Sequence, residues 1–353
     1  MKENTTMGDA PPSRQPAPGD LPPVHGGDLS AVKAAPDAFA GDWLDLSTGI
    51  NPFAYPLPPL SPDDWTRLPA AAALDDLLAA ARTAYGCQAE AGIVALPGTQ
   101  AGIQLLPRLF KPARVTILGP TYAEHAYAWR LLGHNVTELD GLPATLADTD
   151  ILVVVNPNNP DGRTLGPDLL RRWRQELAAK GGWLVVDEAF ADVVPEASLA
   201  GGAGAEGLII LRSFGKFFGL AGLRLGFVLA QPAMTEALRA SLGPWAVSGP
   251  ALTIGAAALN DTAWQTAMRN ELRARAQRFD LALRERGIPV LGGTSLYRLA
   301  RVPDAAGLAA ALRQQGVHVR IFERQPQWMR FGLPADEAEF WRRFDLVLSE
   351  FRL

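Results

Sequence analysis

Lys216 is the residue whose sequence context most strongly favours covalent chemistry. It lies between two apolar segments, LIILRSFG at 208–215 and FFGLAGLRLGF at 217–227. A lysine that is removed from water has a lowered pKa, and its neutral amine can form an imine with a carbonyl group. The alternative is a lysine at a sheet edge that extends its charge to solvent. We therefore treat Lys216 as a candidate nucleophile.

Three other polar motifs contain residue types that bind ligands, although each also has a simpler explanation. Gly98-Thr99-Gln100 would open a helix, where free N–H groups favour a phosphate, but it is also an ordinary strand–helix turn. NPNNPDG at 156–162 is typical of a tight turn or of a site. Asp187 ends the apolar run WLVVD, and a buried carboxylate needs a cation or hydrogen-bond donors unless it only caps a helix.

Taken together, these residues match the functional groups of one cofactor, pyridoxal 5′-phosphate (PLP). PLP presents a phosphate, a pyridine nitrogen that must stay protonated, a phenolic oxygen and an aldehyde. The phosphate requires hydroxyl and arginine donors, for which the candidates are Thr99, Ser213 and Arg224. The pyridine nitrogen requires a carboxylate, the phenolic oxygen an amide donor and the aldehyde a lysine. The candidates for these three roles are Asp187, Asn159 and Lys216, in that order.

Short apolar runs alternate with longer helical stretches, which predicts a fold of the α/β class with a mostly parallel, seven-stranded sheet flanked by helices. The runs are residues 93–96, 115–118, 136–139, 151–155, 183–186, 208–211 and 225–230. Several are apolar at successive positions, as is typical of parallel strands buried on both faces. The candidate residues follow the carboxyl ends of these runs, where open α/β sheets bind ligands.

The pattern changes after Pro244, which predicts a second, smaller α/β domain. A helical region spans about 251–286, short strand candidates follow it, and an amphipathic helix covers about 337–352. We expect a disordered leader at 1–24, an N-terminal segment at 25–70 that packs with the small domain, a large PLP-binding domain at 71–245 and a small C-terminal domain at 246–353.

The composition limits the classes of partner. A formal net charge of −4 in 353 residues argues against nucleic acid or an anionic membrane as the main partner, and no apolar run is long enough to span a bilayer. The single cysteine excludes an intrachain disulfide and a cysteine-rich metal site, and it fits a reducing cytoplasm. We expect a cytoplasmic enzyme with a small-molecule substrate and no bound metal.

The motifs NPNNPDG, VVDEAF at 185–190 and RSFGKFFGLAGLRLGF at 212–227 occur in an order that resembles the fold-type I PLP enzymes, specifically the histidinol-phosphate aminotransferase-like branch. The resemblance covers about residues 25–353. It implies that Lys216 carries PLP as a Schiff base and that the substrate amine later displaces it. It also implies that Asp187 pairs with the pyridine nitrogen with support from His125, that Tyr122 stacks on the ring, and that Asn159 bonds the phenolic oxygen.

The same resemblance assigns residues to the anionic groups of the cofactor and substrate. The residues implied around the cofactor phosphate are Gly98, Thr99, Gln100, Ser213 and Arg224. Arg330, in WMRFGL, would bind the substrate α-carboxylate, and Arg320, in VHVRIF, would bind a substrate phosphate.

Two N-terminal motifs narrow the resemblance. HGGD at 25–28 and LDLSTGINPFAYP at 44–56 resemble the threonine-phosphate decarboxylases of cobalamin biosynthesis. Those enzymes convert L-threonine O-3-phosphate into (R)-1-aminopropan-2-ol phosphate. The resemblance implies that His25 and Asn51 lie near the substrate. From its residues alone, HGGD also fits a glycine turn with a surface histidine.

The chain departs from the wider aminotransferase pattern at two positions. Phe190 replaces a tyrosine that usually donates to the phenolic oxygen, and Leu68 replaces a tyrosine that usually reaches the cofactor phosphate of the neighbouring subunit. The family pattern implies a homodimer, and Leu68 removes one contact between the subunits. Both departures argue against a straightforward histidinol-phosphate aminotransferase.

The residues leave the reaction open, because the same side chains serve a decarboxylase and an aminotransferase. The N-terminal resemblance favours the decarboxylase. A PLP-binding regulatory protein would carry a basic DNA-binding segment, which this sequence lacks. An inactive scaffold would not need the set Lys216, Asp187 and Asn159.

Overall fold

The larger lobe is built on a seven-stranded sheet. The computed structural model describes residues 22–23, 25–35 and 38–351, so most of the expected leader at 1–24 lies outside the described residues. In spatial order the strands are β2 (Gly92–Leu96), β8 (Gly226–Ala230), β7 (Leu208–Ser213), β6 (Trp183–Asp187), β5 (Ile151–Val155), β3 (Arg114–Leu118) and β4 (Asn135–Leu139). Each strand overlaps a predicted run, and the mostly parallel sheet is confirmed.

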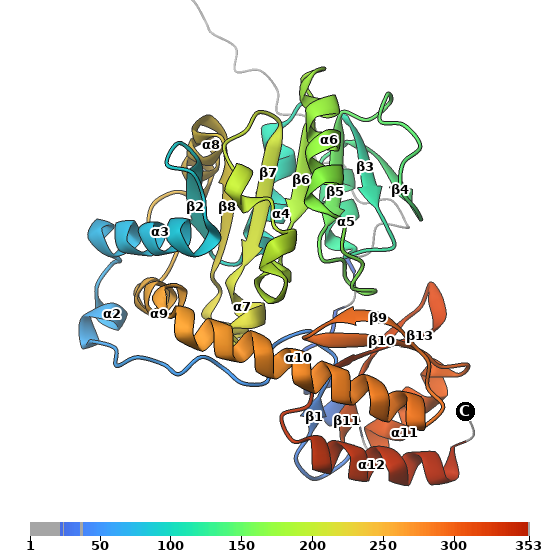
Figure 1. Cartoon of the computed structure of the whole chain (residues 1–353). Coiled ribbons are helices and arrows are strands. Elements are labelled where there is room, and N and C mark those ends of the chain that lie inside the picture. Colours follow the sequence, from blue (N-terminus) through green and yellow to red (C-terminus); the bar gives the residue numbers. More distant parts are fainter. Residues whose placement is uncertain (1–21, 24, 36–37, 352–353) are drawn as a thin grey trace, which may run out of the picture.

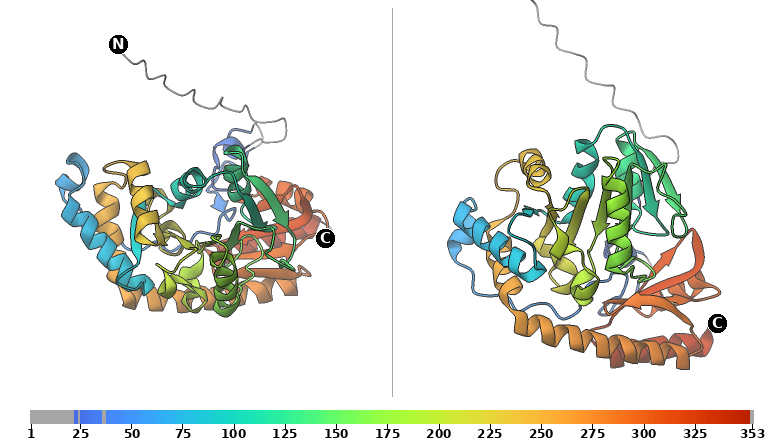
Figure 2. Two further views of the ribbon diagram at one scale, coloured as in Figure 1. Left: turned by 90° about the horizontal axis from the view of Figure 1, so that it is seen from above. Right: turned by 45° about the horizontal axis from the view of Figure 1, so that its top comes forward.

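Helices cover both faces of this sheet (Figures 1 and 2). Alternate residues of β5 enter two separate hydrophobic clusters, with Leu152 and Val154 in one and Ile151 and Val153 in the other. This is the physical reason for the continuous apolar run, because both sides of a buried parallel strand face packed helices. The first cluster takes in α3 (Ala71–Tyr85) and α6 (Pro167–Ala178), and the second takes in α4 (Thr99–Leu105), α5 (Glu124–Leu131) and α8 (Pro232–Leu242).

The strand directions bring the candidate residues to one edge of the sheet. β8 is antiparallel to both of its neighbours, β2 and β7, whereas the other pairs are parallel. The carboxyl ends of β2, β3, β5, β6 and β7 therefore share an edge with the start of β8. Arg224, which precedes β8, reaches that edge for this reason, and the short helix α7 (Phe214–Phe217) places Lys216 there directly after β7.

The smaller lobe contains a four-stranded antiparallel sheet and two helices. Its strands lie in the order β12 (Arg320–Phe322), β13 (Gln325–Gly332), β10 (Tyr297–Arg301) and β9 (Val290–Thr294). The helices are α11 (Ala305–Gln314) and α12 (Glu337–Glu350). The long helix α10 (Thr262–Glu285) extends beneath the larger lobe to this sheet (Figure 1). None of the helices in the described ranges has the length and apolar character needed to cross a membrane.

The single helical region expected at about 251–286 is two helices, which corrects the sequence interpretation. α9 (Gly249–Asn260) ends before Asp261, and α10 begins at Thr262. Asp261 has φ −86° and ψ 77°, and its side chain accepts a hydrogen bond from Trp264 N at 2.9 Å. The carboxylate caps the new helix, and its backbone conformation breaks the helical path.

The N-terminal segment contacts both lobes. β1 (Leu44–Asp45) pairs in parallel with β11 (Val317–His318) of the smaller lobe. The helix α2 (Pro62–Thr66) instead lies against α9, where Thr253 Oγ1 donates to Asp64 Oδ1 at 2.7 Å. A further short helix, α1 (Ser30–Lys33), follows the HGGD motif. The expected packing of 25–70 with the small domain thus describes β1 but not α2, and the domain boundaries stay a prediction.

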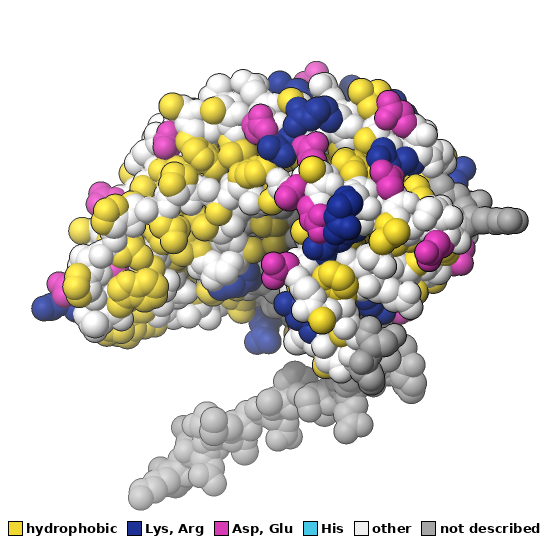
Figure 3. Space-filling model, turned by 90° about the horizontal axis from the view of Figure 1, so that it is seen from below, with side chains coloured by type: hydrophobic (Ala, Val, Ile, Leu, Met, Phe, Trp, Pro, Cys, Tyr) yellow, Lys and Arg dark blue, Asp and Glu magenta, His cyan; other side chains and the backbone are white. Residues whose placement is uncertain are grey.

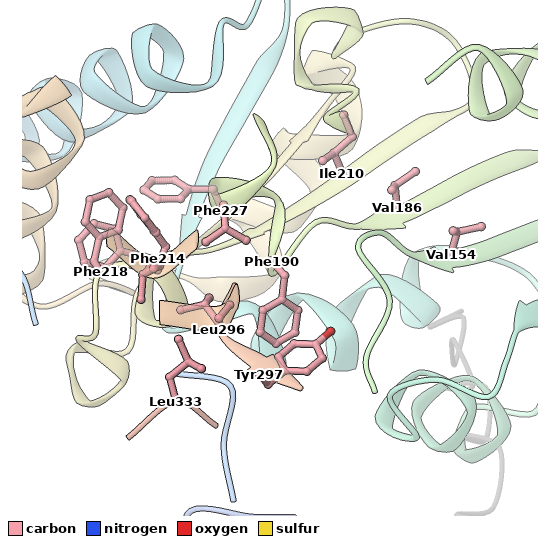
Figure 4. Packing of buried hydrophobic residues seen from close by; sticks show 14 of the residues in the cluster. Val154, Val186, Phe190, Ile210, Phe214, Phe218, Phe227, Leu296, Tyr297 and Leu333 are labelled. Atoms are coloured by element: carbon pink, nitrogen blue, oxygen red, sulfur yellow. The ribbon is translucent and has the colours of Figure 1, made fainter. Parts of the chain in front are cut away.

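Aromatic packing joins the two lobes beside the carboxyl edge. Phe190, just after β6, packs edge-to-face on Tyr297 of β10 with ring centroids 5.0 Å apart (Figure 4). The Tyr297 hydroxyl donates to the backbone oxygen of Asn158. Both rings are nearly inaccessible to solvent. The hydrophobic position at residue 190 therefore helps to hold the smaller lobe against the loop that follows β5.

A buried ion cluster lies at the ends of β6 and β7, next in the chain to cavity residues but outside the cavity lining. Arg212 of β7 is 3% exposed, and its Nη1 lies 2.9 Å from Glu188 Oε2 while its Nη2 pairs with Asp192. The guanidinium also stacks 4.3 Å from the centre of the Tyr85 ring. Burial raises the pKa of Glu188, and Arg212 opposes that rise. The arginine is therefore what makes two buried carboxylates tolerable.

Replacing Arg212 with methionine should lower the free energy of unfolding by about 3–5 kcal/mol, because two carboxylates would lose their buried cation. Urea denaturation followed by circular dichroism measures this loss. The matched control is Arg171→Met, which removes an exposed pair with Asp168 and should change the unfolding midpoint little. Equal effects of the two variants would contradict the role given to Arg212.

Candidate active site

The polar residues at the carboxyl edge line a cavity of about 320 Å³, within the usual range for small-molecule sites. Its wall combines the larger lobe, the N-terminal segment and the smaller lobe. The expected site residues in the lining are His25, Gly98, Thr99, Gln100, Tyr122, Asn159, Asp187, Ser213, Lys216, Arg224, Arg320 and Arg330. The topology thus brings together residues that are up to about 300 positions apart.

Lys216 is the lysine in this wall, and its surroundings make the amine easier to deprotonate. Burial is the main cause of its lowered pKa, which falls to about 8, and the charges of Arg330 and Arg224 lower it further. Asp187 acts in the opposite direction but does not outweigh them. The part of the chain that the structure describes offers the Lys216 amine no hydrogen-bond partner. A partly buried amine without a partner suits imine formation with an aldehyde.

Asp187 and His125 form a buried pair behind the cavity. Asp187 is 3% exposed and His125 is 1% exposed, and Asp187 Oδ2 lies 2.8 Å from His125 Nε2. The backbone N–H of Ala189 donates to the other carboxylate oxygen at 3.0 Å. His125 does not line the cavity, so its expected role at the cofactor can be exerted only through its contact with Asp187. A carboxylate held in this way can keep a pyridine nitrogen protonated.

At one end of the cavity, Gly98 and Arg224 approach each other closely. Gly98 has φ 80°, and a Cβ atom there would lie 2.4 Å from Arg224 Nη2. Arg224 itself has φ 53° and donates from Nη1 to Ala221 O at 3.1 Å. Thr99 and Ser213 add hydroxyl groups to the same lining. Glycine is required at position 98 because any side chain would displace the guanidinium, and these donors fit a phosphate group.

Arg330 connects three parts of the chain. Its Nη1 donates to the Asn159 side-chain oxygen, and its Nη2 donates to the backbone oxygen of Ser47 at 2.6 Å. Its Nε is buried without a partner in the described part of the chain. Burial lowers the pKa of Arg330 to about 10. A buried guanidinium with an unused donor fits an anionic ligand such as a carboxylate.

Arg320 lies directly opposite Arg330 in the register of β12 and β13. Both side chains line the cavity, and burial lowers the pKa of Arg320 as well. Like charges opposite each other on neighbouring strands repel. The pair therefore favours a ligand with anionic groups that can lie between or beside the two guanidinium groups.

A hydrogen-bond network that the sequence analysis missed is centred on Glu124. The carboxylate accepts from Gln100 Nε2 at 2.6 Å and lies 2.7 Å from His25 Nε2. The hydroxyl of Tyr122 donates to Gln100 Oε1 at 3.3 Å. Glu124 follows Tyr122 by two residues, and what distinguishes it from a surface glutamate is its burial and its contacts with His25 and Gln100, which local sequence does not reveal. Ser47 was missed as well, because it acts through its backbone oxygen.

Asn51 does not line the cavity, in contrast to the expectation that it lies near the substrate. It is 2% exposed, its side-chain nitrogen donates to Phe217 O at 2.8 Å, and its side-chain oxygen accepts from Phe53 N at 2.9 Å. Its backbone N–H also donates to Lys216 O at 2.9 Å. Asn51 therefore supports the segment that carries Lys216, and a contact with substrate stays a prediction without support from this geometry.

The residues present fit the groups of PLP. Lys216 meets the need for an amine, the Asp187–His125 pair suits the pyridine nitrogen, and Arg224 with its neighbouring hydroxyl groups suits the phosphate. The Asn159 side-chain nitrogen has no hydrogen bond to the described residues, so it can serve the phenolic oxygen. Phe190 is packed on Tyr297 and has no hydroxyl group, which leaves Asn159 as the donor at that position.

Comparisons with known proteins agree with this fit. The sequence profile of the class I and II aminotransferases matches residues 60–340. The threonine-phosphate decarboxylase of Pseudomonas aeruginosa is 46% identical over 330 residues, covering 93% of this chain and 98% of that protein.

Solved structures show the same fold. The histidinol-phosphate aminotransferase of Clostridium acetobutylicum superposes with a TM-score of 0.77 at 21% identity, covering 87% of this chain and 99% of that one. The L-threonine-O-3-phosphate decarboxylase of Porphyromonas gingivalis superposes with a TM-score of 0.71 at 20% identity, covering 87% and 98%. Given the profile match and the extent of the shared sequence, this chain belongs to the class I and II aminotransferase family of fold-type I enzymes.

Proposed function

We propose that this protein is a PLP-dependent decarboxylase that converts L-threonine O-3-phosphate into (R)-1-aminopropan-2-ol phosphate for cobalamin biosynthesis. The observation that carries the proposal is the register of Arg320 opposite Arg330 in the wall of a cavity that also contains Lys216. Two adjacent guanidinium groups suit a substrate with a phosphate and a carboxylate. The extensive similarity to the Pseudomonas aeruginosa threonine-phosphate decarboxylase supports the same reaction.

In this proposal, a different arginine binds each of the two anionic groups of the substrate. Arg330 binds the α-carboxylate from the cavity wall, while its hydrogen bonds to Asn159 and Ser47 hold the guanidinium in place. Arg320 binds the phosphate at the more accessible end of the cavity. Because Arg330 is fixed by two bonds before substrate arrives, little orientation has to be acquired on binding.

PLP, when bound, supplies an electron sink for the bond that breaks at the substrate Cα. The side chains of the protein support that chemistry by keeping the pyridine nitrogen protonated and by positioning the cofactor ring. Asp187, held by His125, keeps a proton on the pyridine nitrogen. Tyr122 lies in the cavity wall with its ring available for stacking. The Lys216 amine lines the same cavity, and in its protonated form it would be placed to give a proton to Cα once the carboxylate has left as CO₂.

The choice between decarboxylation and transamination depends on which Cα bond is held perpendicular to the cofactor ring. The arginine that holds the carboxylate fixes the orientation of the Cα bonds in either reaction, so the choice between the two reactions rests on other features. Phe190, which carries no hydroxyl group, and Leu68, whose side chain is 66% exposed, both depart from the pattern of the aminotransferases. We therefore favour the decarboxylase over a histidinol-phosphate aminotransferase.

Incubating the PLP-loaded protein with L-threonine O-3-phosphate and no keto acid should release CO₂ and aminopropanol phosphate in equal amounts, over many turnovers. Lys216→Ala should abolish the release, because the proton donor and the cofactor attachment are lost. Release of CO₂ is followed with a ¹⁴C-carboxyl label. If no CO₂ appears but histidinol phosphate with 2-oxoglutarate yields glutamate, the protein is an aminotransferase and the proposal is wrong.

Capture of PLP by the apoprotein should depend on pH through Lys216. The pKa of about 8 means that the amine is mostly protonated below pH 8 and neutral above it. The rate of capture should rise about tenfold per pH unit below pH 7 and level off above pH 9. Stopped-flow absorbance of the imine band measures this rate. Lys111→Arg, at an exposed position, should keep the profile, and a midpoint near 10 would contradict the burial effect.

We also propose that the protein acts as a homodimer. Hydrophobic side chains gather on the half of the molecule that carries α2, α3 and α9 (Figure 3). They include Trp65, which is 70% exposed, Leu57, which is 61% exposed, and Trp245, which is 58% exposed. A hollow of about 270 Å³ beside Trp245 is lined mainly by apolar residues of α3, β2 and the α8–α9 connection. An apolar surface of this kind favours a second copy of the chain.

Introducing charge into this surface should separate the subunits. In sedimentation velocity, wild type should sediment as a dimer and the double variant Trp65→Glu, Leu68→Glu as a monomer, because each charge would be buried without a partner. Leu142→Glu is the control, since Leu142 is 56% exposed and follows β4, the edge strand farthest from β2, and should not affect assembly. A dimer that survives the double substitution would exclude this surface as the interface.

A further inference from the structure

The HGGD motif forms a strap, residues 25–28, that contributes to the mouth of the cavity. Ser47 holds one end of the strap, since Gly27 N donates to Ser47 Oγ at 2.8 Å. Gly26 packs so closely that a Cβ atom there would lie 2.5 Å from Ser47 O. The same Ser47 oxygen accepts a hydrogen bond from Arg330. Gly26 is therefore explained by a close approach to an atom that also orients a cavity arginine, whereas Gly27 has φ 93°, a conformation that favours glycine.

Glu124 holds the other end of the strap. His25 Nε2 lies 2.7 Å from Glu124 Oε1, and this contact joins residues that are 99 positions apart. Glu124 is 7% exposed, although it stands in the first turn of α5 where a glutamate could face solvent. Within the described ranges, His25 is the one basic side chain that pairs with it. A carboxylate buried without lysine or arginine is stabilised only by the hydrogen bonds it accepts.

The second oxygen of Glu124 is bonded to the wall that carries Tyr122. Glu124 Oε2 accepts from Gln100 Nε2 at 2.6 Å and from Gln104 Nε2 at 3.3 Å. Gln100 then accepts from the Tyr122 hydroxyl at 3.3 Å. The Tyr122 and His25 rings lie 5.3 Å apart. One carboxylate therefore connects the strap to the aromatic ring expected to cover the cofactor.

We propose that Glu124 is a positioning residue that holds the HGGD strap across the cavity mouth through His25 and holds Tyr122 through Gln100. Glu124 does not itself line the cavity, so it acts on the substrate only through these neighbours. The statement about the substrate rests on the proposed decarboxylase function. The statement about the strap rests on the hydrogen bonds alone and can be tested without turnover.

Hydrogen–deuterium exchange of the PLP-loaded protein tests the strap directly. Glu124→Ala should speed exchange at the Gly27 amide about tenfold or more, because the strap loses one of its two attachments. Gly26→Ala should have the same effect by disturbing the other attachment. Glu124→Gln should stay close to wild type, since its amide oxygen can still accept from His25. Glu138→Ala on β4, which removes an ion pair with Arg130 of α5, is the control. Unchanged exchange in Glu124→Ala would overturn the proposal.

Steady-state kinetics test the link to substrate. Glu124→Ala should raise KM for L-threonine O-3-phosphate about tenfold with kcat changed less than about threefold, because the strap positions rather than reacts. Glu124→Gln should restore most of the loss. In a double-mutant cycle, His25→Ala should add little further loss in the Glu124→Ala background. Fully additive losses, or an equal fall in PLP content, would contradict the assignment.

The outcomes of the exchange experiment and of the activity assay are independent of each other. If wild type releases no CO₂ from L-threonine O-3-phosphate, the proposed function is wrong, and the exchange experiment still decides whether Glu124 holds the strap. If CO₂ is released but Glu124→Ala leaves both exchange and KM unchanged, the function stands and the role of Glu124 is wrong.

Discussion

The buried guanidinium of Arg330 is the contact on which the organisation of the cavity depends. It extends from β13 of the smaller lobe to Asn159 after β5 and to Ser47 of the N-terminal segment. Three segments that are distant in sequence are thereby held around one charge. Burying a guanidinium is unfavourable unless its donors are satisfied, and here two of its three nitrogens donate hydrogen bonds to Asn159 and Ser47. The same charge lowers the pKa of Lys216 and so favours its reactive form.

Around Arg330 the cavity combines strong positive charge with two protected carboxylates. Lys216, Arg224 and Arg320 complete the cationic wall, which matches ligands that carry phosphate and carboxylate groups. Asp187 and Glu124 are both buried, and each is oriented by a histidine from a different direction. Asp187 can act on the cofactor ring, whereas Glu124 lies behind the wall. The separation shows how carboxylates can be kept near an anion-binding site without competing for its arginines.

The fold was largely predictable because the sheet is buried on both faces. Runs such as ILVVV are apolar at every position, and this pattern follows directly from helices packing on either side of a parallel strand. Boundaries that depend on a single polar residue were harder to predict. Asp261 divides one apparent helix into two because its side chain caps the second, and periodicity alone does not reveal that choice. The packing of α2 on α9 likewise depends on a contact across 189 positions.

The sequence by itself determined the residue types of the site and their places at strand ends, so that Lys216, Asp187, Asn159 and Arg224 could be expected at one edge. Only the tertiary structure decided which side chains meet. It brought Glu124 and Ser47 into the network, removed Asn51 from the cavity lining, and set Arg320 opposite Arg330. The physical reason is that strand-end positions follow from local periodicity, whereas contacts between lobes depend on how whole elements pack, and no local pattern carries that information.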